Sequence, residues 1–304
     1  MEVALSLLES ARQWVLQNLP YDRSDASLVA YLHSLDAEGL LIAYHNWIGR
    51  LVKPQPRTVV KSIALKKYPL TGRRASDLAR IIDDIEKGRD LKKYLSRDVE
   101  RAPVRAPGEQ RADLDLMLND WGVHHLHIST QVEADGFVKR DEALLFVAFK
   151  PQAAYLIDIM NHGDWTRGRV LEVLATEWPE EGIIHQVPIP VGDNLTDEHR
   201  KALRKKHANA LFEIGDKAFA PAGGLMASGT SIAATICTHR VLHALEVFEQ
   251  KFDDDPDWLH KEWGAQGLTY PVAPEFDFAI REDGFGIIER KTGTWMNLTG
   301  WLTA

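Results

Sequence analysis

A chain of 304 residues, of which 45% are apolar, is long enough to form two or three compact units and too apolar to be disordered throughout. Its single cysteine, Cys237, excludes a disulfide within the chain and a thiolate metal cluster, and it suits a reducing compartment. The opening residues MEVALSLLESARQW lack the features of a signal peptide, and no stretch approaches the roughly 20 apolar residues of a membrane span. We therefore expect a cytoplasmic protein with no membrane partner.

Charge is distributed unevenly along the chain, although the formal net charge is −8. Residues 50–111 contain 17 basic and 8 acidic side chains, a net charge of +9. Residues 112–304 contain 17 basic and 30 acidic side chains, a net charge of −13. A basic segment of this kind either contacts phosphate groups or packs against the acidic remainder of the same chain or an acidic partner.

The first 90 residues are predicted to be mostly helical, because apolar residues recur there at helical spacing. Pro20 ends the first helix, Ser24 or Asp25 caps the second, and Gly88 lies just past the end of the last. The expected helices cover residues 3–18, 25–35, 36–48 and about 74–86.

A polar, proline-bearing stretch at residues 100–113 predicts a loop or linker, after which the apolar pattern changes to alternation. The runs VHHLHIS, ALLFVAF and AAYLIDIM predict three strands, of which the last two form a hairpin around Lys150-Pro151-Gln152. The expected later elements are a helix over 167–177, a strand IIHQVPIPV that is an edge strand or an irregular one, and a helix over 196–210. A glycine-rich loop over 219–231, a helix over 232–252 and a terminal hairpin, FDFAI with FGIIERK, are expected to follow.

Two histidines on the first central strand are the leading candidates for a functional site. Side chains alternate along a strand, so His125 and His127 share one face and Leu126 and Ile128 share the other. His162 follows the AAYLIDIM strand, in a polar and aromatic cluster where a strand gives way to a helix. Functional residues are common at the ends of such elements.

The segment from residue 87 to residue 166 resembles the C-terminal sheet of RelE-like ribonuclease toxins. In that family a strand with a basic pair is followed by a hairpin that ends in a basic residue, polar residues and an aromatic. Here HHLHIS matches the first strand, the two apolar runs match the hairpin, and His162-Gly163-Asp164-Trp165 matches the terminal cluster. GRDLKKYLS is similar to the family's linker into the first strand. The chain departs from the pattern in having His-x-His in place of Arg-x-Arg, a long insertion after His127, and a much greater length.

The resemblance implies metal-independent RNA cleavage in a toxin or phage-defence protein, with an antitoxin or another protein as partner. His125, His127 and His162 would transfer protons, because imidazole titrates near neutral pH. Arg140 and Lys150 would hold the phosphate. Trp165 would stack on a base. No cofactor is expected for this chemistry. The alternative is a non-enzymatic binding or structural protein whose sheet presents polar side chains to a partner.

A second nuclease pattern lies in the terminal hairpin, where Asp277 precedes Glu289-Arg290-Lys291. An Asp on one strand and Glu-x-Lys on the next is typical of PD-(D/E)xK nucleases, in which the carboxylates hold Mg²⁺ and the lysine orients water. This alternative assigns Asp277, Glu289 and Lys291 to a Mg²⁺-dependent DNA nuclease, although few residues follow the motif and a solvated hairpin carries the same charges.

Other side chains are candidates for metal or phosphate binding. His125, His127, Glu133 and His162 are similar to the first metal-binding motif of cupins. Glycines at 223, 224 and 229 precede a long helix, where backbone N–H groups either cradle a phosphate or form a tight loop capped by Ser or Thr. On that helix His239 and His243 have a spacing that suits zinc or ordinary packing, and a basic run at 201–207 suits a solvated face or a nucleic-acid contact.

Together these patterns predict an α+β protein. We expect a helical, basic N-terminal region over 1–86, a RelE-like antiparallel sheet domain over 87–168, and a mixed C-terminal region over 169–304 with a long helix and a terminal hairpin.

Overall fold

The computed structural model describes residues 7–69, 71–101, 103–106, 108–109, 111–161, 168–189, 195–221, 223–265 and 267–302. The chain folds into two compact units, each built from segments that are distant in the sequence. The terminal unit consists of Met1–His45, Ala106–Glu109 and Ala234–Ala304, and the central unit consists of Asn46–Arg105 and Gln110–Ala233. These units do not follow the boundaries expected after residues 86 and 168.

The α+β class is confirmed, with antiparallel sheets at the centre of the chain and at its end. The main sheet has the order β1-β4-β3-β2, and β2, β3 and β4 pair antiparallel as expected. β1 joins its far edge parallel to β4 and was not predicted, because one exposed and three half-buried residues after Lys53-Pro54-Gln55-Pro56 carry little strand signal. The strands are β1 (Thr58–Lys61), β2 (Val123–His127), β3 (Ala143–Phe149) and β4 (Ala153–Asn161).

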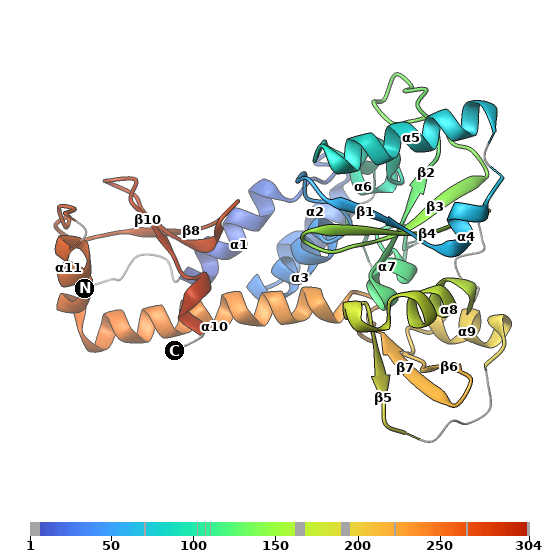
Figure 1. The fold of residues 1–304 in the computed structure, drawn as a ribbon. Helices are drawn as coiled ribbons and strands as arrows, with labels where there is room; N and C mark the ends of the chain where they lie inside the picture. Colours follow the sequence, from blue (N-terminus) through green and yellow to red (C-terminus); the bar gives the residue numbers. More distant parts are fainter. Residues whose placement is uncertain are drawn as a thin grey trace. The chain divides into compact units, whose positions relative to one another are not determined.

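Helices cover both faces of this sheet, so nearly all of β3 is buried (Figure 1). On one face α5 (Gly72–Glu86) packs Leu78, Ile81 and Ile85 against the sheet. On the other face α7 (Leu116–Trp121) and α8 (Gly168–Glu177) pack against alternate residues of the same strands. Burying both faces explains why ALLFVAF is a continuous apolar run and not an alternating one.

A small second sheet packs on the α8 side of the central unit. Its strands are β5 (Ile184–Val187), β6 (Phe212–Ile214) and β7 (Lys217–Pro221), in the order β5-β7-β6. β5 is an edge strand, as predicted, and it ends directly before Pro188. Thr196 caps α9 (Asp197–Lys205) as predicted, but the helix ends before residue 210, because His207 adopts a left-handed φ of 55°. Short helices complete the unit: α4 (Ile63–Lys67), η1 (Lys92–Tyr94), α6 (Asp98–Arg101) and η3 (Pro179–Glu181).

The terminal unit is helical with one antiparallel sheet. Asp25 caps the second helix as predicted, and Trp14 of α1 packs edge-on against Tyr44 of α3 and Phe278 of β8. The helices are α1 (Leu7–Asn18), α2 (Ala26–Ser34), α3 (Ala37–Ile48), α10 (Ile232–Asp254), α11 (Pro256–Ala265) and η4 (Thr299–Leu302). The predicted hairpin of β8 (Phe276–Arg281) and β9 (Gly284–Glu289) is present, and β10 (Trp295–Asn297) extends it. Within the described ranges no helix has the length and hydropathy needed to cross a membrane.

Candidate active site

The histidines of β2 divide between the two faces of the main sheet. His125 pairs with Phe146 and His127 with Leu144, so both lie on the α7 side, as the alternation predicted. They differ in access: His127 is only 3% exposed, whereas the side chain of His125 is 22% exposed. Of this pair, His125 is therefore the one that lines a cavity open to a ligand.

A cavity of about 260 Å³ in the central unit places His125 among both apolar and charged groups. Its size is below that of a pocket that encloses a whole drug-sized ligand, so it suits part of a larger substrate. We call this cavity the His125 pocket. Its apolar lining residues are Ala112, Leu114, Leu116, Met117, Leu144 and Phe146, and its polar lining residues are Arg50, Ser96, Asp98, Asp115 and His125.

Asp115 lies beside the ring of His125. Its Oδ1 caps α7 by accepting the backbone N–H of Leu118 at 3.0 Å, which fixes the carboxylate. Its Oδ2 lies 3.4 Å from Nδ1 of His125. Nδ1 is the buried ring nitrogen, so Nε2 is the nitrogen available to a substrate.

Arg50 provides a fixed positive charge beside this pair. Its side chain is buried, with the residue 4% exposed, and its Nη2 donates to the carbonyl oxygen of Ala112 at 3.4 Å. Burial lowers the pKa of Arg50, and the nearby charges of Asp115, Asp113 and Asp98 act in the opposite direction. A guanidinium keeps its charge under these conditions, so the pocket contains one fixed cation beside the carboxylates of Asp98 and Asp115.

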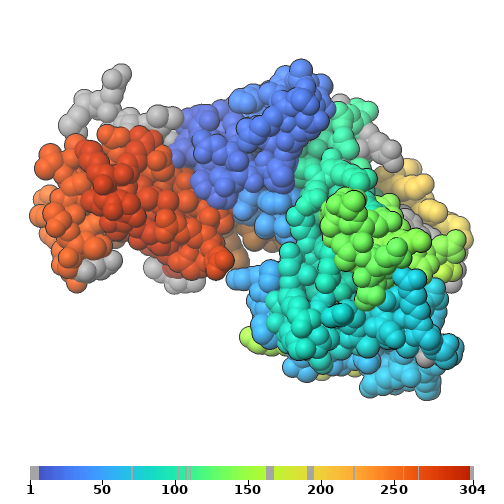
Figure 2. All heavy atoms as spheres, turned by 90° about the horizontal axis from the view of Figure 1, so that it is seen from above, coloured from blue at the N-terminus to red at the C-terminus, as the bar shows by residue number. Residues whose placement is uncertain are grey.

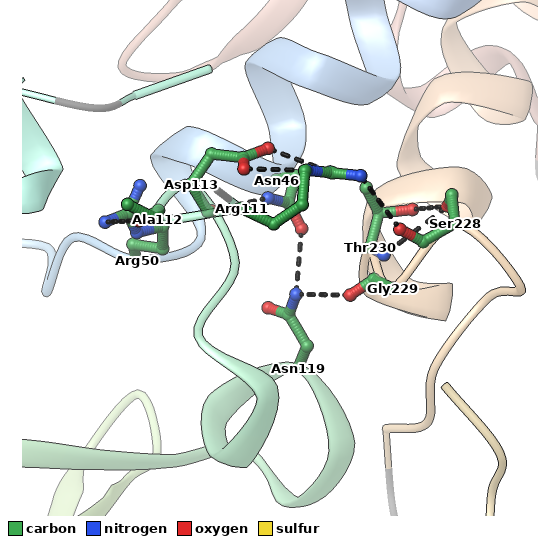
Figure 3. A network of polar contacts seen from close by, with 9 residues as sticks. All are labelled: Asn46, Arg50, Arg111, Ala112, Asp113, Asn119, Ser228, Gly229 and Thr230. Atoms are coloured by element: carbon green, nitrogen blue, oxygen red, sulfur yellow. Dashed lines mark hydrogen bonds and ion pairs between the residues drawn. The ribbon is translucent and has the colours of Figure 1, made fainter. Parts of the chain in front are cut away.

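The chain leading into Asp115 is held by a network of polar contacts (Figure 3). Arg111 binds both carboxylate oxygens of Asp113, at 2.8 and 2.9 Å, and donates to the carbonyl oxygen of Ser228 at 3.3 Å. Asn119 donates to Asn46 at 3.1 Å and to the carbonyl oxygen of Gly229 at 3.0 Å. These hydrogen bonds hold the end of the predicted linker at 100–113 within the central unit. They therefore fix the position of Asp115, which follows it.

The glycine-rich loop supports this network and does not present a row of free N–H groups. The backbone N–H of Gly224 donates to Asn119, that of Leu225 to Asn209, and that of Ile232 to Gly224. Ser231 caps α10 by accepting the N–H of Ala233 at 3.1 Å. Since these donors already have partners within the chain, the geometry favours the tight capped loop over the phosphate cradle.

The two cations expected at the histidine site lie at opposite ends of β3. Arg140 precedes the strand and Lys150 follows it, and neither lines the His125 pocket. The Nζ of Lys150 donates to the carbonyl oxygen of Gly182 at 3.0 Å. β3 also lies between β2 and the end of β4, the point that His162 follows. His162 and Trp165 themselves lie outside the described residues.

The metal-binding alternatives do not assemble in the described part of the chain. In the cupin-like set Glu133 pairs with Arg97 and His125 pairs with Asp115. On α10, His239 pairs with Glu38 and His243 with Glu246, while Cys237 is exposed. Among the described residues no group of three or more His, Cys, Asp or Glu side chains has an arrangement that could hold a metal ion.

The nuclease pattern of the terminal hairpin is contradicted by the strand register. Phe276 pairs with Glu289 and Asp277 with Ile288, so the two carboxylates point to opposite faces of the hairpin. Asp277 binds Arg290 through both oxygens, at 2.8 and 2.9 Å. Glu289 is fully buried and accepts from the backbone N–H and hydroxyl of Thr292. Lys291 donates to the carbonyl oxygens of residues 272 and 273, and these three side chains do not converge on one ion.

His124 lies on the opposite face from His125 and is expected to make the protein sensitive to acid. Burial lowers its pKa to about 4, neither ring nitrogen has a hydrogen-bond partner among the described residues, and its ring packs edge-on against Phe149. In the unfolded chain His124 binds a proton near pH 6.5, whereas in the folded chain it stays neutral until the pH is near 4. The free energy of unfolding therefore falls as the pH drops from about 6.5 to about 4. Between pH 7 and pH 5 this costs about 2 kcal/mol.

Urea unfolding of the wild type and of His124→Phe at pH 7 and pH 5 measures this contribution. The wild type should lose about 2 kcal/mol more than the variant, because all other titrating groups are shared. His185→Phe, at an exposed position on β5, should behave as the wild type. Equal losses in the wild type and His124→Phe would show that His124 is not kept neutral by burial.

Two groups of the pocket, Asp115 and Arg50, were not identified from the sequence. Asp115 precedes an apolar run in the manner of a helix cap, which is a signal for the helix but not for its contact with His125. Arg50 is a single arginine after α3 with no motif around it. Scans against protein-family models and searches of curated proteins and solved structures find no match to the chain, and its resemblance to RelE-like toxins stays a prediction.

Proposed function

We propose that the chain cleaves RNA without a metal ion and that the His125 pocket is where the reaction takes place. The observation that carries the proposal is His125 beside the carboxylate of Asp115 and the buried guanidinium of Arg50 in one pocket. Such a site has the proton-transfer group and the fixed cation that phosphodiester cleavage needs. The apolar walls from Leu114, Met117 and Phe146 limit access of water to the reacting groups.

The reaction uses the ribose 2′-hydroxyl as the nucleophile. Nε2 of His125 takes the hydroxyl proton, and the 2′-oxygen forms a bond to the adjacent phosphorus. The bond from phosphorus to the 5′-oxygen of the next nucleotide breaks, and the proton carried by the imidazolium is returned to that oxygen. The products are a 2′,3′-cyclic phosphate and a 5′-hydroxyl. Arg50 stabilises the added negative charge on the phosphorane, and Asp115 stabilises the imidazolium that forms in between.

The same proposal places the chain among toxin or defence proteins, in line with the similarity of its residues 87–166 to RelE-like toxins. His127 then supports the strand from a buried position, in contrast to the direct proton transfer expected from the sequence. A protein partner of the antitoxin kind would restrain the activity by covering the His125 pocket.

The purified chain incubated with mixed RNA and with single-stranded DNA, each with and without EDTA, tests this function. We expect RNA to be cut at equal rates with and without EDTA and DNA to remain intact, because the nucleophile belongs to the ribose. RNA cleavage that EDTA abolishes, or equal cleavage of DNA, would contradict the proposal. If both substrates stay intact over the range from pH 6 to pH 8, a non-enzymatic binding role replaces it.

A further inference from the structure

A second, larger concavity of the central unit is rich in cations. It has a volume of about 790 Å³ and lies where the start of α5 meets the segment that follows β2. Figure 2 shows this face, on which the light-green residues after β2 adjoin the cyan surface of α5. We call it the basic groove. Its charged lining residues are Arg73, Arg74, Lys139, Arg140, Asp77 and Asp141, four cations against two carboxylates.

Several other cations of the basic segment have carboxylate partners within the central unit. Asp83 and Asp84 pair with Lys87, Arg89 and Lys93, and Asp135 pairs with Arg97 and Arg101. Of these carboxylates only Asp135 lies outside residues 50–111, and the pairs of Asp83 and Asp84 leave the net charge of +9 unchanged.

The cations of the groove are exposed and weakly held. The structure gives no ion pair to Lys139 or Arg140 within the described ranges, and both side chains face solvent. Arg73 lies 3.6 Å from Asp77 and is 68% exposed, and Arg74 lies 3.2 Å from Asp141 and is 42% exposed. The Arg74–Asp141 pair is exposed on both sides, and such pairs contribute about 0–1 kcal/mol, so an incoming phosphate exchanges with it at little cost. Asp77, the partner of Arg73, is buried, with its side chain 8% exposed.

The polar groups around these cations suit a nucleic-acid backbone. α5 is a helix of 15 residues that begins in the groove, and its N-cap residue Thr71 makes no side-chain capping bond. Its first N–H groups add a partial positive charge to that of the arginines. Tyr68 and Thr71 also line the groove and provide a ring for stacking and a hydroxyl for hydrogen bonds to phosphate or ribose.

We propose that the basic groove binds the phosphates of single-stranded RNA next to the nucleotide that enters the His125 pocket. The inference rests on the proposed function for its choice of RNA. Ser129 of the groove is four residues after His125, so their Cα atoms are at most about 14 Å apart. The groove lies on the α5 face and the His125 pocket on the α7 face of β2, which is the edge strand of the sheet, so the RNA would pass around this edge. One strand of RNA is long enough to contact both, and Lys139 and Arg140 hold its backbone while His125 acts on one ribose. Arg140 thus keeps the phosphate-binding role expected of it, in the groove.

Binding of a fluorescent 2′-O-methyl RNA oligonucleotide, followed by anisotropy, tests the groove separately from cleavage. The 2′-O-methyl group removes the nucleophile, so affinity is measured without reaction. Lys139→Gln/Arg140→Gln should bind roughly tenfold more weakly than the wild type, and its slope of log affinity against log salt should be smaller by about 1.4, or about 0.7 for each lost phosphate contact. All substituted residues are exposed, and thermal unfolding checks that the fold is unchanged.

Lys201→Gln/Lys205→Gln is the matched control, since it removes two exposed cations from α9 of the same unit. If the groove variant binds as the control does, or if the wild type does not bind the oligonucleotide at low salt, the groove proposal is overturned. Groove-dependent binding without any cleavage of unmodified RNA supports the groove and rejects the catalytic proposal. Cleavage whose KM is the same in the groove variant and the wild type rejects the groove alone.

Discussion

Replacing His125 by glutamine is expected to lower the rate of RNA cleavage by at least about 100-fold, because proton transfer by a positioned side chain contributes about 10²–10⁴-fold. Glutamine retains a polar group of similar length at the mouth of the pocket but cannot accept and return a proton near neutral pH. The substitution lies in a partly exposed position, so the urea midpoint should stay close to that of the wild type. Initial rates on a defined oligoribonucleotide measure the effect.

Asp115→Asn gives a sharper view of the same site. Asparagine is as good a helix N-cap as aspartate, so α7 keeps its cap while the pocket loses the negative charge beside His125. We expect the variant to lose most of the activity, and the double variant with His125→Gln to be no worse than His125→Gln alone. His185→Gln, at an exposed position on β5, is the control and should cleave at the wild-type rate. Independent, additive losses would contradict the coupling of Asp115 to His125.

The largest effect on stability is expected at a buried ion pair between α9 and α7. The Nε of Arg204 lies 3.0 Å from Oδ2 of Asp120, and the two side chains are only 4% and 6% exposed. Burial raises the pKa of Asp120, and the charge of Arg204 opposes that rise. Asp120→Asn leaves a buried guanidinium without a carboxylate, which should lower the free energy of unfolding by about 3–5 kcal/mol.

Urea denaturation of three variants distinguishes this cause from loss of packing. Asp120→Asn should be strongly destabilised, while Asp120→Leu/Arg204→Met should recover most of the loss, because neither charge is then buried. Lys205→Met, at the exposed neighbouring position on α9, should change stability by less than about 0.5 kcal/mol. If the double variant is as unstable as Asp120→Asn, the loss comes from poorer packing of the side chains and not from an unpaired buried charge.

Local patterns were enough to place most elements of the fold. Helical spacing with caps located α1, α2, α3, α5, α9 and α10, and apolar runs located β2, β3 and β4 with their hairpin. Alternation also placed His125 and His127 on one face. These features depend on neighbouring residues alone. The short strand β1 was missed because its pairing with β4 is a long-range contact that few local residues specify.

The site was harder to predict than the fold because its members come from distant segments. Arg50 follows α3, Asp115 caps α7 and His125 lies on β2, and only the tertiary structure brings them together. Position in the chain was misleading for Lys150. It directly follows β3, at the opposite end of that strand from Arg140. Alternation along a strand also does not predict how far a side chain is buried. His127 shares the face of His125 but is buried, opposite Leu144 on β3.

The most direct test of the central claim uses a DNA oligonucleotide with a single ribonucleotide, incubated with the wild type and with His125→Gln in the presence of EDTA. The proposed chemistry predicts one cut by the wild type, on the 3′ side of the ribonucleotide, leaving a 2′,3′-cyclic phosphate on one product and a 5′-hydroxyl on the other. His125→Gln should leave the oligonucleotide intact over the same time. An intact oligonucleotide after incubation with the wild type, or cutting by His125→Gln at the wild-type rate, would contradict the assignment of RNA cleavage to the His125 pocket.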